Sequence, residues 1–129
     1  MINAVITGIG AYLPETKLTN DDLSKMVDTN DEWIMTRVGI KERRILKTEG
    51  SGASDMGALA VKDLLAKKGL QPSDIDLVIC TTVTPDAPIP STAAIICDKC
   101  DIRDAHSFDI NGACSGFLCG LDLCAQYVR

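Results

Sequence analysis

Residues 75–83 read IDLVICTTV, a run of apolar and β-branched residues that is interrupted only by Asp76. A run of this length without polar alternation is typical of a strand that is buried on both faces of a parallel sheet. We therefore expect such a strand over 75–83. Pro85, Pro88 and Pro90 follow it and predict a stiff loop, because proline disfavours both helix and inner strand.

The segments on either side of this strand alternate between strand and helix patterns. We expect strands over 3–9, 40–46 and 105–110, and helices over 20–27, 30–38, 53–68, 91–100 and from Cys114 to the end. Thr19 and Thr29 each precede an acidic residue by three positions, which is typical of N-caps. Gly39 and Gly69 are expected to end their helices as left-handed caps. This order predicts an α/β fold with a mostly parallel sheet.

Composition narrows the class of protein. The chain has 129 residues, of which 46% are hydrophobic, 24% charged and 4% aromatic, as expected of one globular core built from small aliphatic residues. The net charge of −5 argues against a nucleic-acid-binding domain, which is usually strongly basic. The positive charges nevertheless concentrate in one basic island: Arg37, Lys41, Arg43, Arg44 and Lys47. The island indicates either a solvated stretch or a site for a small phosphorylated ligand.

The compartment is inferred from the N-terminus and the apolar runs. The first residues lack a basic leader and a cleavage site, and no apolar run reaches the roughly 20 residues that a membrane span needs. We therefore expect a cytoplasmic protein that does not interact with a membrane.

In reducing cytosol most of the six cysteines are expected to be buried thiols, including Cys119 and Cys124. Cys97 and Cys100 form a C-x-x-C pair, and a small redox or zinc-binding module is the alternative that it raises.

Residues 109–117 read DINGACSGF and place Cys114 where a strand turns into a helix. Unpaired N–H groups and the positive end of the helix dipole stabilise a thiolate there. Gly112, Ala113 and Gly116 are expected to leave room for a substrate beside the sulfur. The backbone N–H of Cys114 can then face a carbonyl oxygen under attack, so the stretch predicts an acyl-accepting nucleophile. A buried structural cysteine beside a tight turn is the alternative.

Trp33 and Arg37 stand four residues apart and share a face if 30–38 is helical. A core tryptophan covered by an arginine is one interpretation. Because the basic island begins at Arg37, we favour a second interpretation, in which Trp33 is a platform for a ligand.

Three stretches together resemble one known family. They are GACSGF at 112–117, GIGAYLP at 8–14, and DTNDEWI at 28–34 followed by TRVGI at 36–40. They are similar to β-ketoacyl-acyl-carrier-protein synthase III, which starts bacterial type II fatty-acid synthesis. The resemblance implies a thiolase-like fold of two similar α/β halves and a homodimer. It also implies that residues 1–129 are the N-terminal part of an incomplete domain, which leaves apolar surface uncovered.

The resemblance also implies the roles of particular residues. Cys114 is acylated by a short acyl-coenzyme A, and decarboxylative condensation with malonyl-acyl carrier protein follows; no cofactor beyond the coenzyme A thioester substrate and no metal is implied. Trp33 stacks on the adenine, Arg37 reaches the phosphates and Thr29 is a further coenzyme A contact. Ile89 closes the neighbouring subunit's acyl pocket. A bulky aromatic residue at this position restricts the pocket, and because isoleucine is smaller, we expect a deeper pocket here. Val38 replaces the family's threonine.

The same resemblance limits what this chain does by itself. The family's condensation step uses a histidine and an asparagine from the second half, and neither has a matching position here. The only histidine, His106, is expected to be structural. We therefore expect the isolated chain to be inactive in condensation. Hydroxymethylglutaryl-coenzyme A synthases and starter-unit synthases share the fold and a similar cysteine, so they remain alternatives for the substrate.

Overall fold

The structure, a computed structural model, describes residues 4–128. These residues form two compact units. The first unit contains the described residues up to Tyr12 and those from Gly52 onward, and the second contains Leu13–Ser51. That both units belong to one synthase domain stays a prediction.

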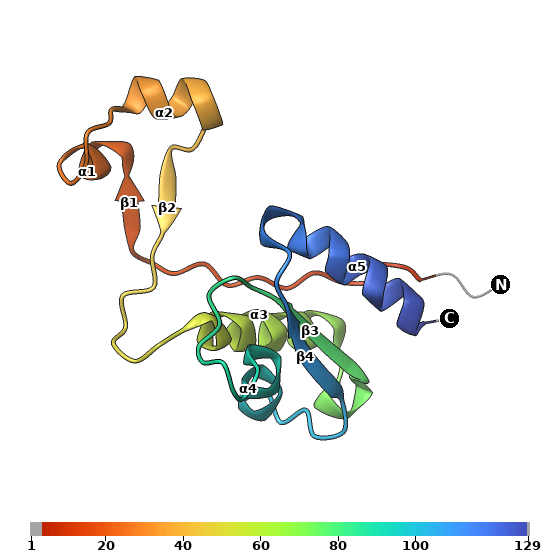
Figure 1. Cartoon of the computed structure of the whole chain (residues 1–129). Helices are drawn as coiled ribbons and strands as arrows, with labels where there is room; N and C mark the ends of the chain where they lie inside the picture. Colours follow the sequence, from red (N-terminus) through yellow and green to blue (C-terminus); the bar gives the residue numbers. More distant parts are fainter. Residues whose placement is uncertain (1–3, 129) are drawn as a thin grey trace. The chain divides into compact units, whose positions relative to one another are not determined.

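The first unit contains a two-stranded parallel sheet and three α-helices (Figure 1). In chain order its elements are α3 (Ala53–Lys68), β3 (Leu77–Thr81), α4 (Thr92–Lys99), β4 (His106–Ile110) and α5 (Gly116–Tyr127), with single 3₁₀ turns at Pro72–Asp74 and Ala113–Ser115. β3 and β4 pair in register from Leu77 opposite His106 to Thr81 opposite Ile110. The predicted parallel β-α-β arrangement is thus confirmed for β3, α4 and β4.

Helices cover both faces of this small sheet. Val78 and Cys80 of β3 pack against the buried cluster between α3 and α4. Thr81, which points to the opposite face because side chains alternate along a strand, contacts α5. β3 is nevertheless only half-buried, contrary to the predicted full burial, because the sheet has two strands and both are edges.

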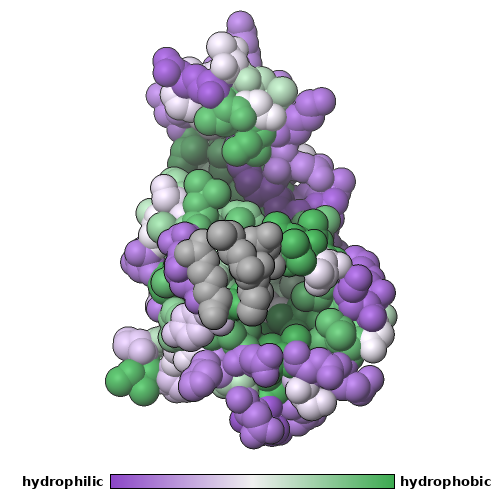
Figure 2. Space-filling model, turned by 90° about the vertical axis from the view of Figure 1, so that its right-hand side faces the viewer, coloured by the Kyte–Doolittle hydropathy of each residue, from purple (hydrophilic) through white to green (hydrophobic). Residues whose placement is uncertain are grey.

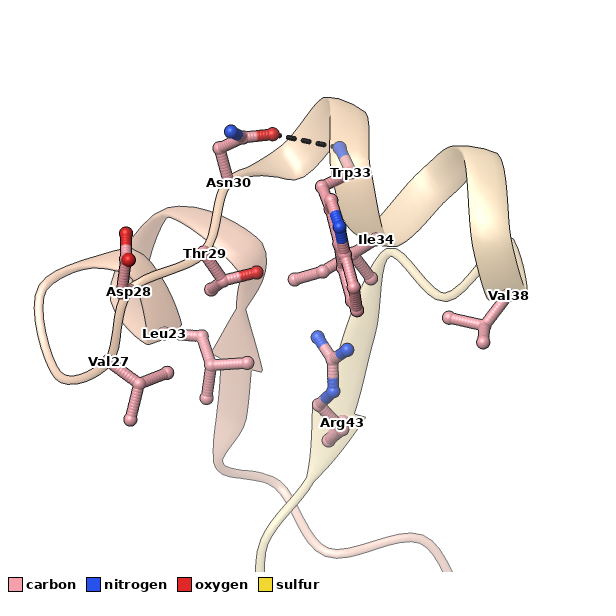
Figure 3. A pocket seen from close by; sticks show the side chains of 9 residues that line it. All are labelled: Leu23, Val27, Asp28, Thr29, Asn30, Trp33, Ile34, Val38 and Arg43. Atoms are coloured by element: carbon pink, nitrogen blue, oxygen red, sulfur yellow. Dashed lines mark hydrogen bonds between the residues drawn. The ribbon is translucent and has the colours of Figure 1, made fainter.

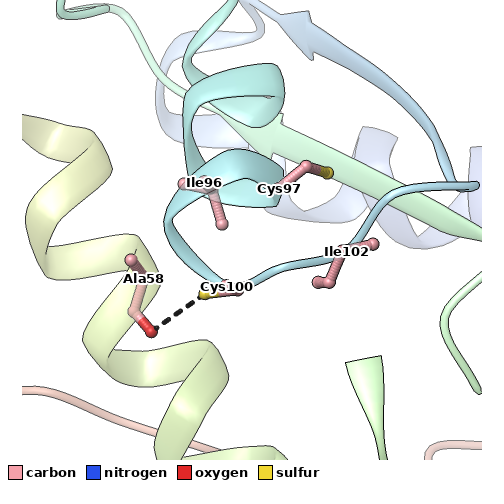
Figure 4. Packing of buried hydrophobic residues seen from close by; sticks show 5 residues of the cluster. All are labelled: Ala58, Ile96, Cys97, Cys100 and Ile102. Atoms are coloured by element: carbon pink, nitrogen blue, oxygen red, sulfur yellow. Dashed lines mark hydrogen bonds between the residues drawn. The ribbon is translucent and has the colours of Figure 1, made fainter. Parts of the chain in front are cut away.

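The core of the first unit lies where α3 meets α4 (Figure 4). Its buried members are Ala58, Ile96, Cys97, Cys100 and Ile102. The Cys100 thiol donates to the carbonyl oxygen of Ala58 at 3.5 Å. The two helices approach closely, since a Cβ added at Gly57 would lie 2.5 Å from Cδ1 of Ile96. The predicted burial of the C-x-x-C pair is confirmed.

The second unit is built on an antiparallel strand pair. Its elements are β1 (Lys17–Thr19), α1 (Asn20–Ser24), α2 (Asp31–Val38) and β2 (Glu42–Arg44). Lys17 pairs with Arg44 and Thr19 with Glu42. Gly39 ends α2 with a φ of 69°, the left-handed cap that the sequence predicts. β2 confirms the expected strand over 40–46, whereas β1 was not anticipated, because its three residues carry no apolar pattern.

Two expected features near the N-terminus are wrong. Within the described part of the expected strand over 3–9 there is no strand; residue 3 lies outside the described residues. Gly8 and Gly10 instead lie against α3, where a Cβ on Gly10 would be 2.3 Å from the carbonyl oxygen of Ala60. The Ala11 N–H donates to Oδ2 of Asp63 at 2.9 Å. A strand needs a neighbouring strand for its backbone groups, and this segment packs on a helix instead.

The second correction concerns the start of α2. The N-cap is Asn30, whose side chain accepts from the Trp33 N–H at 2.8 Å, and not Thr29. Asparagine is at least as good an N-cap as threonine, and it stands one residue closer to the helix. The first helix is also shorter than expected, since α1 ends at Ser24. Thr29 is therefore left outside the helix with its side chain unused by a cap.

The cysteines of α5 also differ from expectation. Cys119 and Cys124 are exposed, as is Cys114, whereas we expected Cys119 and Cys124 to be packing residues. The physical reason is that α5 contacts β3 through its glycines and carries apolar side chains on its other faces as well.

An apolar hollow of about 480 Å³ lies between the N-terminal segment and α5. It is lined by Ala4, Val5, Ile6, Leu121, Cys124, Ala125 and Val128. Hydrophobic side chains gather on this side of the molecule (Figure 2). Among residues 4–128, no helix is long and apolar enough to cross a bilayer.

Candidate active site and nucleotide site

The predicted nucleophile lies in the turn between β4 and α5. Cys114 is the central residue of the 3₁₀ turn Ala113–Ser115 and is exposed. Ala113 has a φ of 44°, in the left-handed region that an alanine seldom adopts. Backbone strain of this kind often occurs at functional sites. The turn therefore presents the Cys114 thiol at the carboxyl end of a parallel strand, where α/β folds bind ligands.

The glycines around Cys114 pack closely against neighbouring residues. Gly116 and Gly120 are buried, and a Cβ added to them would lie 3.3 Å and 2.9 Å from Thr81. A Cβ on Gly112 would lie 2.9 Å from Cα of Gly116. Gly112 and Gly116 therefore allow close packing of the turn and of α5 on β3. That they also leave room for a substrate beside the sulfur stays a prediction.

A small cavity of about 200 Å³ lies at the carboxyl ends of β3 and β4. It is lined by Thr82, Pro85, Ala87, Pro88, Asp109, Ile110 and Asn111. The proline-rich loop thus faces the end of β4, a few residues before Cys114. Ile89, in the same loop, is 88% exposed. This exposure fits both an exposed apolar loop residue and a side chain that contacts another subunit, so the contact with another subunit stays a prediction.

Two carboxylates fix the segments around this cavity. Asp109 of β4 accepts hydrogen bonds from the N–H groups of Thr92 at 2.7 Å and Ala93 at 2.8 Å, at the start of α4. Asp86, in the proline-rich loop, accepts from the Ser54 N–H at 3.0 Å, at the start of α3. Burial opposes ionisation of Asp86, but the hydrogen bonds from Ser54 outweigh it and hold the pKa below its ordinary value.

The three less exposed thiols of the first unit, Cys80, Cys97 and Cys100, are poor nucleophiles. Burial raises the pKa of Cys97 and of Cys100. Burial, together with the nearby Asp109 and Asp86 carboxylates, also raises the pKa of Cys80. Because the thiolate is the reactive form, these three residues are poorly suited to attack a carbonyl or to bind a metal. Within residues 4–128 there is no group of three or more His, Cys, Asp or Glu side chains placed to hold a metal ion.

The second unit contains a cavity of about 530 Å³ (Figure 3). Its lining residues are Leu23, Val27, Asp28, Thr29, Asn30, Trp33, Ile34, Val38 and Arg43. Two residues with predicted roles, Thr29 and Trp33, thus line one cavity. The Thr29 hydroxyl, which no cap uses, points toward the indole of Trp33 (Figure 3).

Trp33 is a surface residue. Its side chain is 54% exposed, and the guanidinium carbon of Arg37 lies 4.8 Å from the centre of its ring. The predicted shared face is therefore confirmed, and the core interpretation of Trp33 is wrong. Arg37 and Trp33 also line a second, adjoining hollow of about 310 Å³. An exposed indole beside two cationic side chains, Arg37 and Arg43, suits a planar ring that carries phosphates.

The predicted site residues therefore fall into two groups. Trp33, Arg37 and Thr29 are brought together in the second unit, and Cys114 and Ile89 belong to the first unit. Arg43 is a cavity residue that sequence reasoning did not single out. The basic island contained it, but the sequence does not say which of its five cations faces the tryptophan.

Comparison with known proteins supports the same family. A model of the FAE1/Type III polyketide synthase-like protein family matches residues 12–129. β-Ketoacyl-(acyl-carrier-protein) synthase III 2 of Bacteroides thetaiotaomicron is 56% identical over 128 residues, which are 99% of this chain and 38% of that protein.

Solved structures agree on the fold. 3-Oxoacyl-(acyl-carrier-protein) synthase III from Aquifex aeolicus VF5 matches with a TM-score of 0.87 at 45% identity. The match covers 94% of this chain and 39% of the Aquifex chain. The priming β-ketosynthase from the R1128 polyketide biosynthetic pathway matches with a TM-score of 0.84 at 33% identity, over 92% of this chain and 35% of its own. The predicted thiolase-like fold is thus confirmed for the part that the chain spans. The chain belongs to the FAE1/Type III polyketide synthase-like family and is a homologue of β-ketoacyl-acyl-carrier-protein synthase III that spans about 38% of the length of its relatives.

Proposed function

We propose that the chain provides the nucleophile and part of the coenzyme A site of a condensing acyltransferase that initiates type II fatty-acid synthesis. The observation that carries the proposal is the exposed Cys114 in a strained turn at the carboxyl end of β4. The names of the relatives, which are β-ketoacyl-acyl-carrier-protein synthases III, support the choice of reaction. A cytoplasmic homodimer is the proposed form of the protein.

In the first half-reaction, the Cys114 thiolate attacks the carbonyl carbon of a short acyl-coenzyme A. A tetrahedral intermediate forms, and its oxyanion is stabilised by backbone N–H groups of the nucleophile turn. The intermediate collapses as the bond to the coenzyme A sulfur breaks. The released coenzyme A thiolate takes up a proton, and the acyl group remains as a thioester on Cys114.

In the second half-reaction, malonyl-acyl carrier protein loses carbon dioxide. The electron pair of the broken bond forms a carbanion, which attacks the acyl carbonyl on Cys114. A carbon–carbon bond forms, the Cys114 thiolate leaves, and 3-oxoacyl-acyl carrier protein is the product. The chain has no residue that matches the family's histidine and asparagine for this step, so we expect the 129 residues alone to be acylated weakly and not to condense.

The cavity at Trp33 supports coenzyme A as the acyl donor. The indole offers a face for adenine, Arg37 and Arg43 offer positive charge for phosphates, and the Thr29 hydroxyl offers a polar contact. Val38 lines the same cavity and supplies no polar contact there. The whole set lies within one unit, Leu13–Ser51.

Acyl transfer to Cys114 is tested by incubating the protein with acetyl-coenzyme A and measuring intact and peptide masses. We expect an adduct of one acetyl group on the peptide that contains Cys114, and no adduct in Cys114→Ala. Cys119→Ala is the matched control, because Cys119 is also an exposed thiol, on the adjoining helix α5. Acetylation of Cys119 or Cys124 in place of Cys114 would overturn the assignment.

A starter-unit synthase for polyketides is the second candidate. The similarity to the priming β-ketosynthase supports it, and the reaction at Cys114 is the same. The acceptor distinguishes the two, so the complete enzyme is to be assayed with malonyl groups on a fatty-acid and on a polyketide carrier protein. Hydroxymethylglutaryl-coenzyme A synthase would require acetoacetyl-coenzyme A as the acceptor. The redox or zinc alternative is disfavoured because Cys97 and Cys100 are buried as neutral thiols.

A further inference from the structure

Arg43 of β2 lies at the cavity of the second unit. Its half-buried side chain lines the cavity of about 530 Å³, and its guanidinium points toward the indole of Trp33 (Figure 3). Among the described residues, no carboxylate lies within 4 Å of this guanidinium. The next residue, Arg44, is different, because it pairs with Glu42 at 3.4 Å and donates to the carbonyl oxygen of Pro14 at 3.2 Å.

Arg43 is held in place by Asn20. The Nη1 group of Arg43 donates to Oδ1 of Asn20, which is only 2% exposed. The amide group of Asn20 donates in turn to Oδ1 of Asp31 at 2.7 Å and to the carbonyl oxygen of Ile40 at 2.9 Å. One buried side chain thus joins the starts of α1 and α2 to β2. Because the amide group of Asn20 is held by these two bonds, its Oδ1 atom has a fixed orientation. The Arg43 guanidinium, which donates to this atom, is therefore held in position as well.

The bond to Asn20 leaves the charge of Arg43 uncompensated. A neutral amide accepts from one of the five N–H groups of a guanidinium and carries no negative charge. The carboxylate that lines the same cavity, Asp28, points away from Arg43 (Figure 3). The negative charge in this network lies at Asp31, one hydrogen bond beyond Asn20, so a phosphate can add a direct charge-assisted contact to the guanidinium.

We propose that Arg43 binds a phosphate group of the nucleotide that stacks on Trp33, and that Asn20 is the positioning residue that aims its guanidinium at that phosphate. The proposal rests on the proposed coenzyme A site and adds to it a second cation besides Arg37. Arg37 lies over the ring of Trp33, whereas Arg43 lines the cavity on the side of Thr29. The two cations are therefore expected to contact different phosphates.

The role of Arg43 is tested by isothermal titration calorimetry of the protein with two probes, adenosine 3′,5′-bisphosphate and adenosine. We expect Arg43→Gln to weaken the bisphosphate by about tenfold or more and to leave adenosine within twofold, because only the charge-assisted contact is lost. Arg44→Gln is the matched control and should keep wild-type affinity for both probes. Equal bisphosphate affinity in the wild type and Arg43→Gln would overturn the proposal, as would equal loss for both probes.

The role of Asn20 is tested with Asn20→Asp, which keeps the acceptor oxygen but neutralises the cation through a salt bridge. We expect the bisphosphate to weaken severalfold more than adenosine, with a thermal midpoint measured alongside to record any loss of folding. An equal loss of both probes would show a purely structural role and overturn the positioning role. A wild-type protein that binds neither probe would overturn the proposed nucleotide site itself, whatever the behaviour of the variants.

Discussion

Ala113 is the residue whose conformation the sequence reveals least. Its φ of 44° costs an L-residue on the order of 1 kcal/mol, and alanine, unlike glycine or asparagine, gives no sign of a left-handed turn. Position 113 directly precedes the nucleophile, and the Ala113 N–H donates to Oδ1 of Asn111 at 3.4 Å. The turn is therefore defined by the packing of its neighbours more than by the preference of its own residues.

Substitution of Ala113 measures this strain. We expect Ala113→Val to lower the free energy of unfolding by about 1–3 kcal/mol, because a β-branched side chain tolerates a positive φ poorly, and Ala113→Gly to change it by less than about 1 kcal/mol. Urea unfolding measures both. Ala66→Val on the exposed side of α3 is the control, where only a few tenths of a kcal/mol are expected. If Ala113→Val and Ala66→Val lowered the free energy of unfolding equally, the backbone strain at position 113 would be contradicted.

Ile89 determines, in our proposal, the depth of the neighbouring subunit's acyl pocket. We expect the complete enzyme to accept primers of four to six carbons, and Ile89→Phe to shift the ratio of kcat/KM values toward acetyl by about tenfold, since a larger ring fills the pocket. Steady-state kinetics with acyl-coenzyme A of increasing length measures the shift. Val83→Phe, at the other end of the loop, is the control. A wild-type enzyme restricted to acetyl would contradict the deeper pocket.

At the scale of the elements, prediction was most successful where the residue type at a helix end has a specific structural role, such as a glycine in the left-handed conformation or a serine that caps the helix. The helix over 53–68 was predicted with its observed bounds, since Gly69 ends it with a φ of 65°. Ser91, where the helix over 91–100 was expected to begin, caps α4 by accepting from the Ala94 N–H. The segment 4–9 has the composition of a strand but no strand beside it, and no pattern in a sequence reports whether a partner is present.

The capping box of α1 predicts a pH dependence. The hydroxyl of Thr19 and the ammonium group of Lys25 lower the pKa of Asp22 from its ordinary 3.8 to about 2. The unfolded chain therefore binds a proton that the folded chain does not, so this stabilisation is present above about pH 4 and is lost as the pH falls toward 2.

Asp22→Asn tests this dependence. We expect the variant to lose less of its thermal midpoint than the wild type between pH 5 and pH 2.5, measured by circular dichroism. Asp21→Asn, beside the capping box, is the control and should follow the wild type. Parallel curves for Asp22→Asn and the wild type would show that the capping box contributes nothing to the acid sensitivity.

At the scale of the whole molecule, the sequence indicated the family and the parallel β-α-β unit, but not the division into two compact units or the exposed faces of α5. The resemblance to the synthase family implied that apolar surface is left uncovered. The structure exposes Phe117, Leu118 and Tyr127 in agreement with this, and hydropathy alone does not say which apolar residues are exposed.

These exposed side chains predict self-association of the 129-residue chain. Leu118 on α5 is 68% exposed, and we expect Leu118→Glu to lower the fraction of associated species in sedimentation velocity at micromolar concentration. Leu59→Glu on α3, at a less exposed leucine, serves as the control with a smaller effect. Unchanged sedimentation of Leu118→Glu would show that α5 does not take part in association.

The double hydrogen bond from Asp109 to the start of α4 has a consequence for how mutants are interpreted. Asp109 lies five residues before the nucleophile and on the wall of the small cavity, so it resembles a catalytic acid when seen from the sequence alone. Its carboxylate is already occupied by two backbone N–H groups. An inactive Asp109 variant would therefore report a displaced helix α4 and not the loss of a catalytic group.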